Sequence, residues 1–374
     1  MSRIANLSER GFPMRYGLFV ISSIFVSSVL SASQSDIRMC KSCHSAIYAE
    51  YEESAHRKST IYDDPLFAEM VKRSPEKRSC AKCHNPGQDS VESHDGIDCL
   101  SCHKITSIKR GEISNNNIYG KDKRTFYSAE ESKKGKKIVY HEESSWFGLV
   151  KKKSGSPYHD IDYSNDIYYN GEQCMGCHSH KKNGHGLDLC RISGGVGDKS
   201  NCISCHMPKV PGSATSIRKS GTHAYHGFGG VSYHKAMGKY VALKVESLND
   251  GFTVDIKNDA PHDLMLHPMR VVELRVNVIS AGATESYRKS FSRVIGHDGK
   301  PAMPWLADEV VKNDMVAGGK SLKVKFDRKL KSGDRVEVEL GYRALSGAVA
   351  GKLGLADKGL DGFKAISKTY YEVP

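Results

Sequence analysis

The feature that most constrains this chain is a short pattern, C-x-x-C-H, which occurs five times in 374 residues. Two thiols separated by two residues on a helical turn can reach the two vinyl groups of one porphyrin, and the next residue, His, then lies beneath the iron. Structural zinc sites and redox dithiols also use C-x-x-C, but neither requires a His after every second Cys. The repeats therefore predict five covalently bound haem c groups.

The five motifs define two sets of predicted ligands. Ten cysteines are predicted to form thioethers with the porphyrins: Cys40, Cys43, Cys80, Cys83, Cys99, Cys102, Cys174, Cys177, Cys202 and Cys205. The His that ends each motif is predicted to bind iron on the proximal side: His44, His84, His103, His178 and His206.

The chain has 17 His, so twelve remain as candidates for the distal side of the irons. Ligation by two His gives low-spin iron suited to electron transfer, whereas an open distal position permits substrate binding. For each spare His the alternative is a surface or structural role. The predicted distal ligands are His56, His94, His185, His223 and His226. His56 lies on a stretch, Ile47–Lys58, whose Tyr48, Tyr51 and Ala55 recur at helical spacing.

One thiol is left over because the number of cysteines, 11, is odd. Cys190 stands in Leu-Asp-Leu-Cys-Arg without a neighbouring thiol or His. It is either a buried free thiol or remnant of a motif, or a reactive sulfur beside a haem, which a lowered pKa next to Arg191 would favour.

The N-terminal residues 1–32 are predicted to be a signal peptide. Arg3, Arg10 and Arg15 precede an apolar stretch, Gly17–Leu30, which ends in small residues. That stretch is shorter than the roughly 20 residues that span a membrane. The alternative is an uncleaved anchor with peripheral membrane association, and Met14 is an alternative start. The predicted location is the periplasm, with a surface or anchored position as the alternative.

The motifs fall into two clusters within a predicted haem domain, 33–237. A motif-free basic insertion, 104–173, separates them, and residues 104–153 hold 13 Lys/Arg against 6 Asp/Glu. The insertion is either a solvated, flexible segment, or a docking surface for an acidic partner or anion. Nucleic acid is not an expected partner, because the chain is predicted to be exported and carries no recognisable binding module.

The pattern changes at residue 238, where a β-sandwich domain of 238–374 is predicted. Val241–Leu248 and Phe252–Lys257 alternate around an Asn-Asp-Gly turn, which is typical of a hairpin. Further strands are predicted at Val271–Ile279, Tyr287–Ile295, Leu322–Phe326 and Arg335–Tyr342. Short alternating strands separated by turns favour an immunoglobulin-like sandwich. His262 and His267, on a loop between strands, either cap a haem at the domain junction or stabilise the loop.

The first motif, followed by Tyr51-x-x-Ser54-x-His56, resembles the opening of multihaem cytochromes of the cytochrome c-554 type. The close motifs between Cys80 and His103 are similar, as are Cys205-His-Met-Pro and the later His223. The resemblance covers roughly 36–235 and extends to the superfamily of hydroxylamine oxidoreductase and octahaem enzymes. It implies a mostly helical, loop-rich fold with haems in stacked pairs, and it implies that His56 is a distal ligand of a neighbouring haem.

The expected function is therefore electron transfer rather than catalysis. The C-x-x-C-K motif of pentahaem nitrite reductases does not occur in the sequence. The expected partners are redox proteins: a quinol-oxidising membrane cytochrome as donor, and a terminal reductase or an extracellular acceptor. The alternative is a reductase of a small nitrogen or sulfur oxyanion at one five-coordinate haem.

Overall fold

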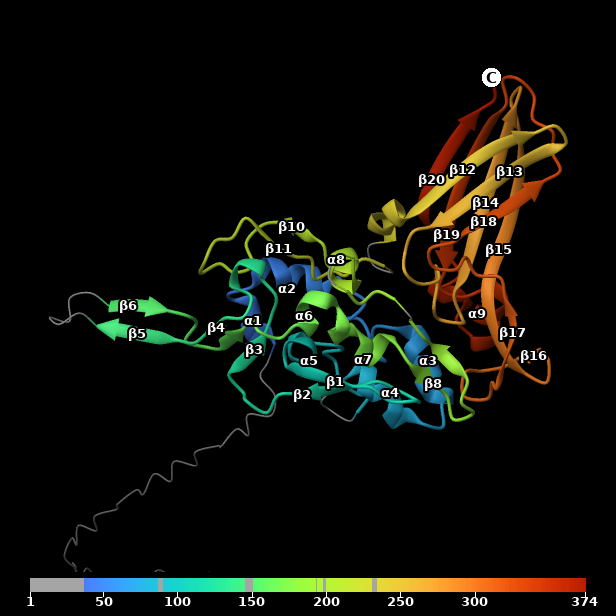
Figure 1. Cartoon of the computed structure of the whole chain (residues 1–374). Coiled ribbons are helices and arrows are strands. Elements are labelled where there is room, and N and C mark those ends of the chain that lie inside the picture. The colour runs from blue at the N-terminus through green and yellow to red at the C-terminus, as the bar shows by residue number, and fades with distance from the viewer. Residues whose placement is uncertain (1–36, 87–89, 145–150, 193, 198–199, 231–233) are drawn as a thin grey trace, which may run out of the picture. The chain divides into compact units, whose positions relative to one another are not determined.

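The computed structural model describes residues 37–86, 90–144, 151–192, 194–197, 200–230 and 234–374 (Figure 1). The predicted signal peptide therefore lies outside the described residues. Among the described residues, no helix is both long enough and apolar enough to cross a membrane.

The part of the chain that holds the motifs, here called the haem-motif region (37–230), is built from short helices. The α-helices are α1 (Arg38–Lys41), α2 (Ser45–Glu52), α3 (Pro65–Arg73), α4 (Lys77–His84), α5 (Cys99–His103), α6 (Ile167–Asn170), α7 (Met175–His178) and α8 (Cys202–His206). The 3-10 turns are η1 (Glu131–Lys133) and η2 (Glu172–Cys174), and η3 (His234–Tyr240) follows the region.

Small sheets connect these helices. The paired strands are β1 (Ile105–Lys109) with β2 (Asn116–Tyr119), β5 (His141–Ser144) with β6 (Lys151–Ser154), β8 (Lys181–Lys182) with β9 (Asp188–Cys190), and β10 (Lys209–Pro211) with β11 (Thr222–Ala224). A three-stranded sheet has the order β3 (Thr125–Tyr127), β7 (Asp160–Asp162), β4 (Lys137–Ile138). The predicted basic insertion thus carries strands and α6.

Local sequence sets the ends of the helices. Asp64 caps α3 by accepting hydrogen bonds from the backbone N–H groups of Leu66 and Phe67, and Pro65 occupies the first helical turn. The expectation of helix through Ile47–Lys58 is only partly met, because α2 ends at Glu52. The helical spacing holds for the buried Tyr48 and Tyr51, and the chain then turns before it reaches His56.

The rest of the chain, here called the β-region (241–374), contains two antiparallel sheets. One has the order β12 (Val241–Leu248), β13 (Gly251–Asn258), β18 (Ser321–Phe326). The other has the order β16 (Lys300–Pro301), β15 (Ala283–His297), β14 (Val271–Ser280), β19 (Arg335–Arg343), β20 (Lys364–Glu372), and β17 (Glu309–Asn313) pairs with β15. The helical elements are α9 (Gly347–Leu353) and η4 (Ala356–Lys358).

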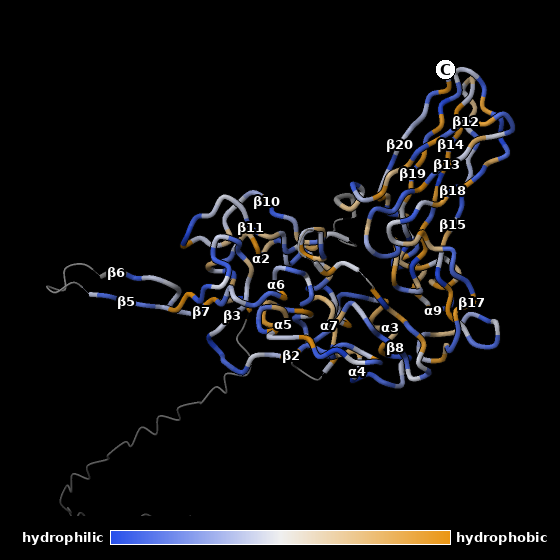
Figure 2. The backbone as a smooth tube through the Cα atoms, in the orientation of Figure 1, coloured by the Kyte–Doolittle hydropathy of each residue, from blue (hydrophilic) through white to orange (hydrophobic). Residues whose placement is uncertain are grey.

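The two sheets share one core. Phe252, Val254 and Ile256 of β13 are fully buried together with residues of β14 and β19, such as Leu274 and Leu340. Figure 2 shows how hydrophobic and hydrophilic residues succeed one another along these strands. The alternation arises because successive side chains point to opposite faces of a strand.

The predicted strands of the β-region are confirmed. β12 and β13 pair from Val241–Asn258 to Leu248–Gly251, with the Asn-Asp-Gly turn between them. β15 is longer than predicted, and β20 was not predicted. The first four residues of β20 are half-buried and the rest alternate between exposed and half-buried. The segment contains Lys, Ser and Thr, so its hydrophobic signal is weak.

Several contacts join the two regions. Leu66 of α3 packs with Leu345, Ala350 and Leu353, which lie in and beside α9. Arg293 of β15 donates a hydrogen bond to the carbonyl of Leu189 at 3.4 Å. Residues 37–374 accordingly form one compact unit. The division into two domains at residue 238 stays a prediction.

Candidate haem sites

The C-x-x-C-H motifs adopt helical turns that their own sequences stabilise. In the third motif, Asp98 and Ser101 form a capping box at the start of α5, and Asn201 and Ser204 form the same box at the start of α8. A helical turn places the two thiols of a motif on one side with the His following them. These two motifs therefore hold the geometry needed for attachment through their neighbouring residues.

The proximal histidines are oriented by backbone carbonyl groups. The Nδ1 atoms lie at hydrogen-bond distance from the following oxygens: His44 from Ala214 (2.8 Å), His84 from Ser59 (3.2 Å), His103 from Tyr127 (2.7 Å) and His206 from Gly229 (2.6 Å). A carbonyl only accepts, so Nδ1 carries the proton and Nε2 keeps its lone pair for a metal ion.

Four of the five motif histidines face a second imidazole. The ring centroids are separated as follows: His44 and His159 by 6.1 Å, His56 and His178 by 5.9 Å, His103 and His226 by 6.2 Å, and His206 and His262 by 6.2 Å. With metal–nitrogen bonds of about 2 Å and about 1 Å from nitrogen to ring centre, two imidazoles that share one metal ion have centres roughly 6 Å apart. All four pairs match this separation.

The fifth motif histidine, His84, has a different neighbour. Its ring stacks on Phe67 with 3.7 Å between centroids and an angle of 6°. Among the described residues, no second imidazole faces His84 at the separation found in the four pairs. His267 lies near enough that His84 contributes to lowering the pKa of His267 to about 4, after burial and Arg270.

Burial favours the neutral form of four of the paired imidazoles. It lowers the pKa of both His56 and His226 to about 3, and it lowers the pKa of His103 and His178 as well. A neutral imidazole is the form that binds a metal ion. The Nδ1 atoms of His56 and His159 are buried without a hydrogen-bond partner, so hydrogen bonding does not account for the burial of these two rings.

The structure separates the predicted distal ligands. His56 and His226 belong to the pairs, whereas both ring nitrogens of His223 are engaged, Nδ1 with the carbonyl of Gly212 and Nε2 with Glu50, each at 3.0 Å. Neither ring nitrogen of His223 is without a hydrogen-bond partner in this arrangement, and its role as a distal ligand stays a prediction. The carboxylate of Glu50 also accepts the backbone N–H of His226 at 2.8 Å, so His223 supports the segment that positions His226.

The other two predicted distal ligands lie at the surface. His94 is exposed and its ring stacks on Tyr62 at 3.9 Å, while its carbonyl accepts a hydrogen bond from Arg57. His185 is exposed and lies between two glycines. Neither residue contacts a motif histidine through its ring. His159, which is not among the predicted distal ligands, lies in the motif-free insertion and faces His44, and no local sequence pattern distinguishes it from other histidines.

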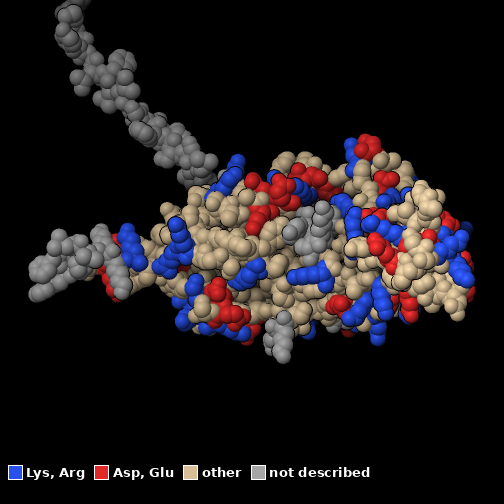
Figure 3. All heavy atoms as spheres, turned by 90° about the horizontal axis from the view of Figure 1, so that it is seen from above, with Lys and Arg blue, Asp and Glu red and all other residues tan. Residues whose placement is uncertain are grey.

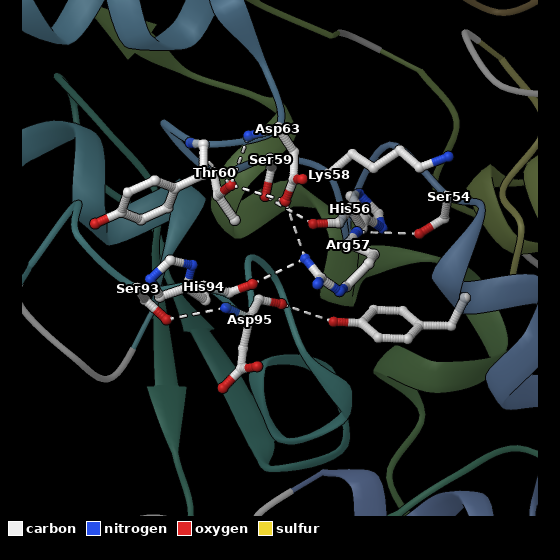
Figure 4. Close-up of polar contacts among 12 residues, drawn as sticks. Ser54, His56, Arg57, Lys58, Ser59, Thr60, Asp63, Ser93, His94 and Asp95 are labelled. Atoms are coloured by element: carbon white, nitrogen blue, oxygen red, sulfur yellow. Dashed lines mark hydrogen bonds and ion pairs between the residues drawn. The ribbon is translucent and has the colours of Figure 1, made fainter.

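The turn that carries His56 is held tightly, as Figure 4 shows. The carbonyl of His56 accepts the hydroxyl of Ser59 at 2.7 Å and the backbone N–H of Ile97 at 3.0 Å. Arg57 donates to Asp63 and to the carbonyl of His94. These contacts fix the backbone on both sides of His56, whose ring then faces His178.

Cys190 is not a thiolate. Burial raises its pKa to about 11, although Lys181 and Arg293 act in the opposite direction. Its Sγ donates a hydrogen bond to the carbonyl of His178 at 3.0 Å, and Arg191 pairs with Asp188 rather than with the sulfur. The contact places Cys190 against the fourth motif as a protonated thiol.

Thiols of different motifs lie side by side. Cys99 lies close enough to Cys40 that this neighbour raises its pKa, and the same holds for Cys177 beside Cys83 and for Cys174 beside Cys202. The pKa of Cys174 is raised first by the neighbouring Cys202 and by burial, with a smaller contribution from Cys102. Motif 1 therefore adjoins motif 3, and motif 4 adjoins motifs 2, 3 and 5.

The residues present fit covalently attached haem. The paired thiols have the spacing that porphyrin attachment needs, and the imidazole pairs have the separation of two axial ligands on one iron. Among the described residues, no group of three or more His, Cys, Asp or Glu side chains converges as a protein-only metal site would require.

Comparisons with known proteins agree with this geometry. Residues 39–104 match the family model "Cytochrome c554 and c-prime". A penta-heme cytochrome c552 from Thermochromatium tepidum is similar in structure, with a TM-score of 0.68 and 19% sequence identity over 89% of this chain and 98% of that one. No match was found among curated proteins.

Two further structures align with only about a third of this chain, and with low TM-scores. They are the E. coli curli protein CsgC (TM-score 0.18, 7% identity, 35% of this chain and 95% of that one) and a superoxide reductase in the oxidized state (0.19, 9%, 36% and 86%). Neither likeness carries weight. The repeated motifs and the family match of 39–104 support a multihaem c-type cytochrome, and the Thermochromatium tepidum protein shares its fold.

Proposed function

We propose that this chain is an exported pentahaem cytochrome that carries electrons between a membrane or periplasmic donor and a terminal reductase or extracellular acceptor. The observation that carries the proposal is the set of four imidazole pairs with centroids 5.9–6.2 Å apart. Two imidazoles that hold one haem iron would leave it no ligand position for a substrate, which would favour reversible one-electron transfer.

The haems supply the redox chemistry, because each iron alternates between its ferric and ferrous states. The protein contributes the axial ligands and their orientation. Backbone carbonyls at Ala214, Tyr127 and Gly229 hold the proximal rings of three motifs with Nε2 directed away from the hydrogen bond. A fixed ring orientation reduces the rearrangement that accompanies a change in iron charge.

The contacts between thiols support transfer through the whole set. Cys40 and Cys99 join motifs 1 and 3, Cys83 and Cys177 join motifs 2 and 4, and Cys174 and Cys202 join motifs 4 and 5. Groups attached to neighbouring thiols lie close to one another, so an electron that enters at one motif can reach the others in short steps.

The proposed location is the periplasm, and the proposed partners are redox proteins. Lysines of the insertion are a proposed contact surface, although Lys133 and Lys134 also lie over the rings of Tyr163 and Tyr169. On the face shown in Figure 3, basic and acidic side chains are intermixed, which favours a transient, salt-sensitive complex. The two sheets of the β-region are proposed to form an immunoglobulin-like sandwich domain.

The test is the low-temperature EPR spectrum of the oxidised protein, recorded with and without cyanide, nitrite or sulfite. The expected result is low-spin signals from the four paired sites that none of these ligands alters. If ligands convert the spectrum of the paired sites, those irons are open and the carrier proposal is wrong.

The second candidate function is reduction of a small oxyanion at the second motif. It is favoured because, among the described residues, no imidazole faces His84 at the 5.9–6.2 Å separation of the four pairs. Arg270 and Arg293 both act on His267 beside this motif, and positive charge favours an anion. A high-spin signal that shifts on addition of nitrite or sulfite, together with turnover of that anion by the reduced protein, would support this function.

A further inference from the structure

We propose that the β-region completes the fifth haem site: His262, on the loop between β13 and β14, is the iron ligand opposite His206. The inference rests on the proposed function as a multihaem protein, and it assigns a ligand from outside the haem-motif region. It makes one iron a direct link between two parts of the chain.

The two rings are placed as axial ligands require. Their centroids are 6.2 Å apart and their planes differ by 18°. Nδ1 of His206 lies 2.6 Å from the carbonyl of Gly229, and Nδ1 of His262 lies 2.8 Å from the carbonyl of Asp263. Both carbonyls accept from Nδ1, so each ring keeps its Nε2 lone pair for the metal ion.

Hydrogen bonds within the protein hold the loop that carries His262. Asn258, at the end of β13, is fully buried and donates from Nδ2 to the carbonyls of His262, Val316 and Ala317 at 2.9–3.2 Å. Its Oδ1 accepts the backbone N–H of Ala260 at 3.0 Å. A buried polar side chain that satisfies several backbone groups makes a rigid support, so the position of His262 follows from the fold of the sheets.

The same loop packs against the fifth motif itself. A Cβ on Gly194 would lie 2.9 Å from both Cβ and the carbonyl oxygen of Pro261, and a Cβ on Gly195 would lie 3.8 Å from Cγ of Pro261 and 3.4 Å from Sγ of Cys202. Gly195 also accepts hydrogen bonds through its carbonyl from the N–H and Sγ of Cys202. The Pro261 ring thus approaches the peptide that holds the attachment thiol.

A second contact reaches the other thiol of the motif. Tyr240, immediately before β12, lies beside Cys205: burial raises the pKa of Tyr240 most, and the neighbouring Cys205 raises it further. The carbonyl of Tyr240 accepts the backbone N–H of Asp259 at 2.9 Å. Tyr240 and the Pro261–His262 loop therefore lie beside Cys205, beside the glycines that contact Cys202, and opposite the motif histidine, which is the arrangement expected of segments that close a haem site.

The ligation is tested by replacing His262 with Ala in the full-length holoprotein. Loss of this ligand should convert one low-spin iron to high-spin. The low-spin EPR intensity should therefore fall by the contribution of about one haem. Added imidazole should restore it. The control is His297→Ala, because His297 is an exposed residue at the end of β15 whose ring bonds the acidic side chains of Asp308 and Asp298. His297→Ala should leave the spectrum unchanged.

A second variant perturbs docking without touching a ligand. Gly194→Val should push the Pro261–His262 loop away and produce a partly high-spin fifth site, whereas Gly184→Val, at a glycine with open space around it, should not. Haem content is checked by the pyridine haemochrome spectrum. If His262→Ala keeps every low-spin signal at full haem content, His262 is not an iron ligand. The carrier proposal would still stand in that case, provided that added ligands leave the wild-type spectrum unchanged.

Discussion

The imidazole rings of His103 and His226 lie 6.2 Å apart between centroids with their planes 19° from parallel. A backbone carbonyl accepts from Nδ1 of each ring, Tyr127 for His103 and Ala224 for His226, both at 2.7 Å. The two residues are far apart in sequence, and only the fold brings them to this separation. The pairing leads to a direct comparison between His226 and its neighbour His223.

Replacing His226 with Ala should convert one low-spin iron to high-spin, because the opposing imidazole of His103 would remain as the single axial His. His223→Ala is the matched variant. It should keep the spin states and instead destabilise the fold by about 1–3 kcal/mol, because the Glu50 carboxylate would lose a buried partner. EPR and thermal unfolding measure the two effects. A high-spin signal in His223→Ala with an unaltered His226→Ala would reverse the assignment.

The insertion should be required for the first haem site through His159. The ring of His159 faces His44 at 6.1 Å between centroids, so His159→Ala should produce one high-spin iron. His141→Ala provides the comparison, since His141 lies in the same insertion but is exposed and pairs with Glu143. Magnetic circular dichroism in the near-infrared, which reports bis-His iron, would distinguish them, and equal spectra for both variants would remove His159 from the ligands.

Gly96 should be intolerant of a side chain. Its φ is +60°, and an added Cβ would lie 2.6 Å from the carbonyl oxygens of His56 and Arg57. Gly96→Ala should therefore destabilise the protein by about 1–3 kcal/mol, and the displaced turn should disturb the ligand His56. Gly135→Ala has a similar backbone strain, φ +78°, but meets nothing within 4 Å. Gly135→Ala should therefore lower the melting temperature less than Gly96→Ala. The difference between the two variants measures the effect of the close contact at Gly96.

Stability should depend on pH through Glu273. This side chain is buried, which raises its pKa, but hydrogen bonds from Arg343 and Arg275 outweigh burial and hold the pKa below its usual value. The unfolded chain therefore binds the proton more tightly, so the contribution is present above the unfolded pKa and is lost as pH falls through the folded pKa.

Glu273→Gln should accordingly cost about 1–3 kcal/mol in the free energy of unfolding at neutral pH, and the difference from wild type should shrink below about pH 4. Glu246→Gln removes an exposed pair with Lys323 and should change stability little at any pH. Urea unfolding between pH 3 and 7 measures both. A cost that stays constant across this range would show that the charge of Glu273 is not its source.

The degree to which sequence anticipates this structure differs between the two regions. In the β-region the Asn-Asp-Gly turn and the alternation on either side predict β12 and β13 closely, because strand pairing there depends on neighbouring residues. In the haem-motif region the helical spacing of Tyr48 and Tyr51 is confirmed, but α2 ends at Glu52. The next residues form a turn that is held by tertiary contacts, so the helix does not continue to His56.

The sequence by itself determines the attachment residues and the proximal ligands, because a C-x-x-C-H motif contains both thiols and the His within one turn of chain. It cannot determine which second imidazole faces each motif. His56 faces His178, His159 faces His44 and His262 faces His206 across long separations in sequence. Such contacts depend on how distant segments pack, so only the tertiary structure decides them.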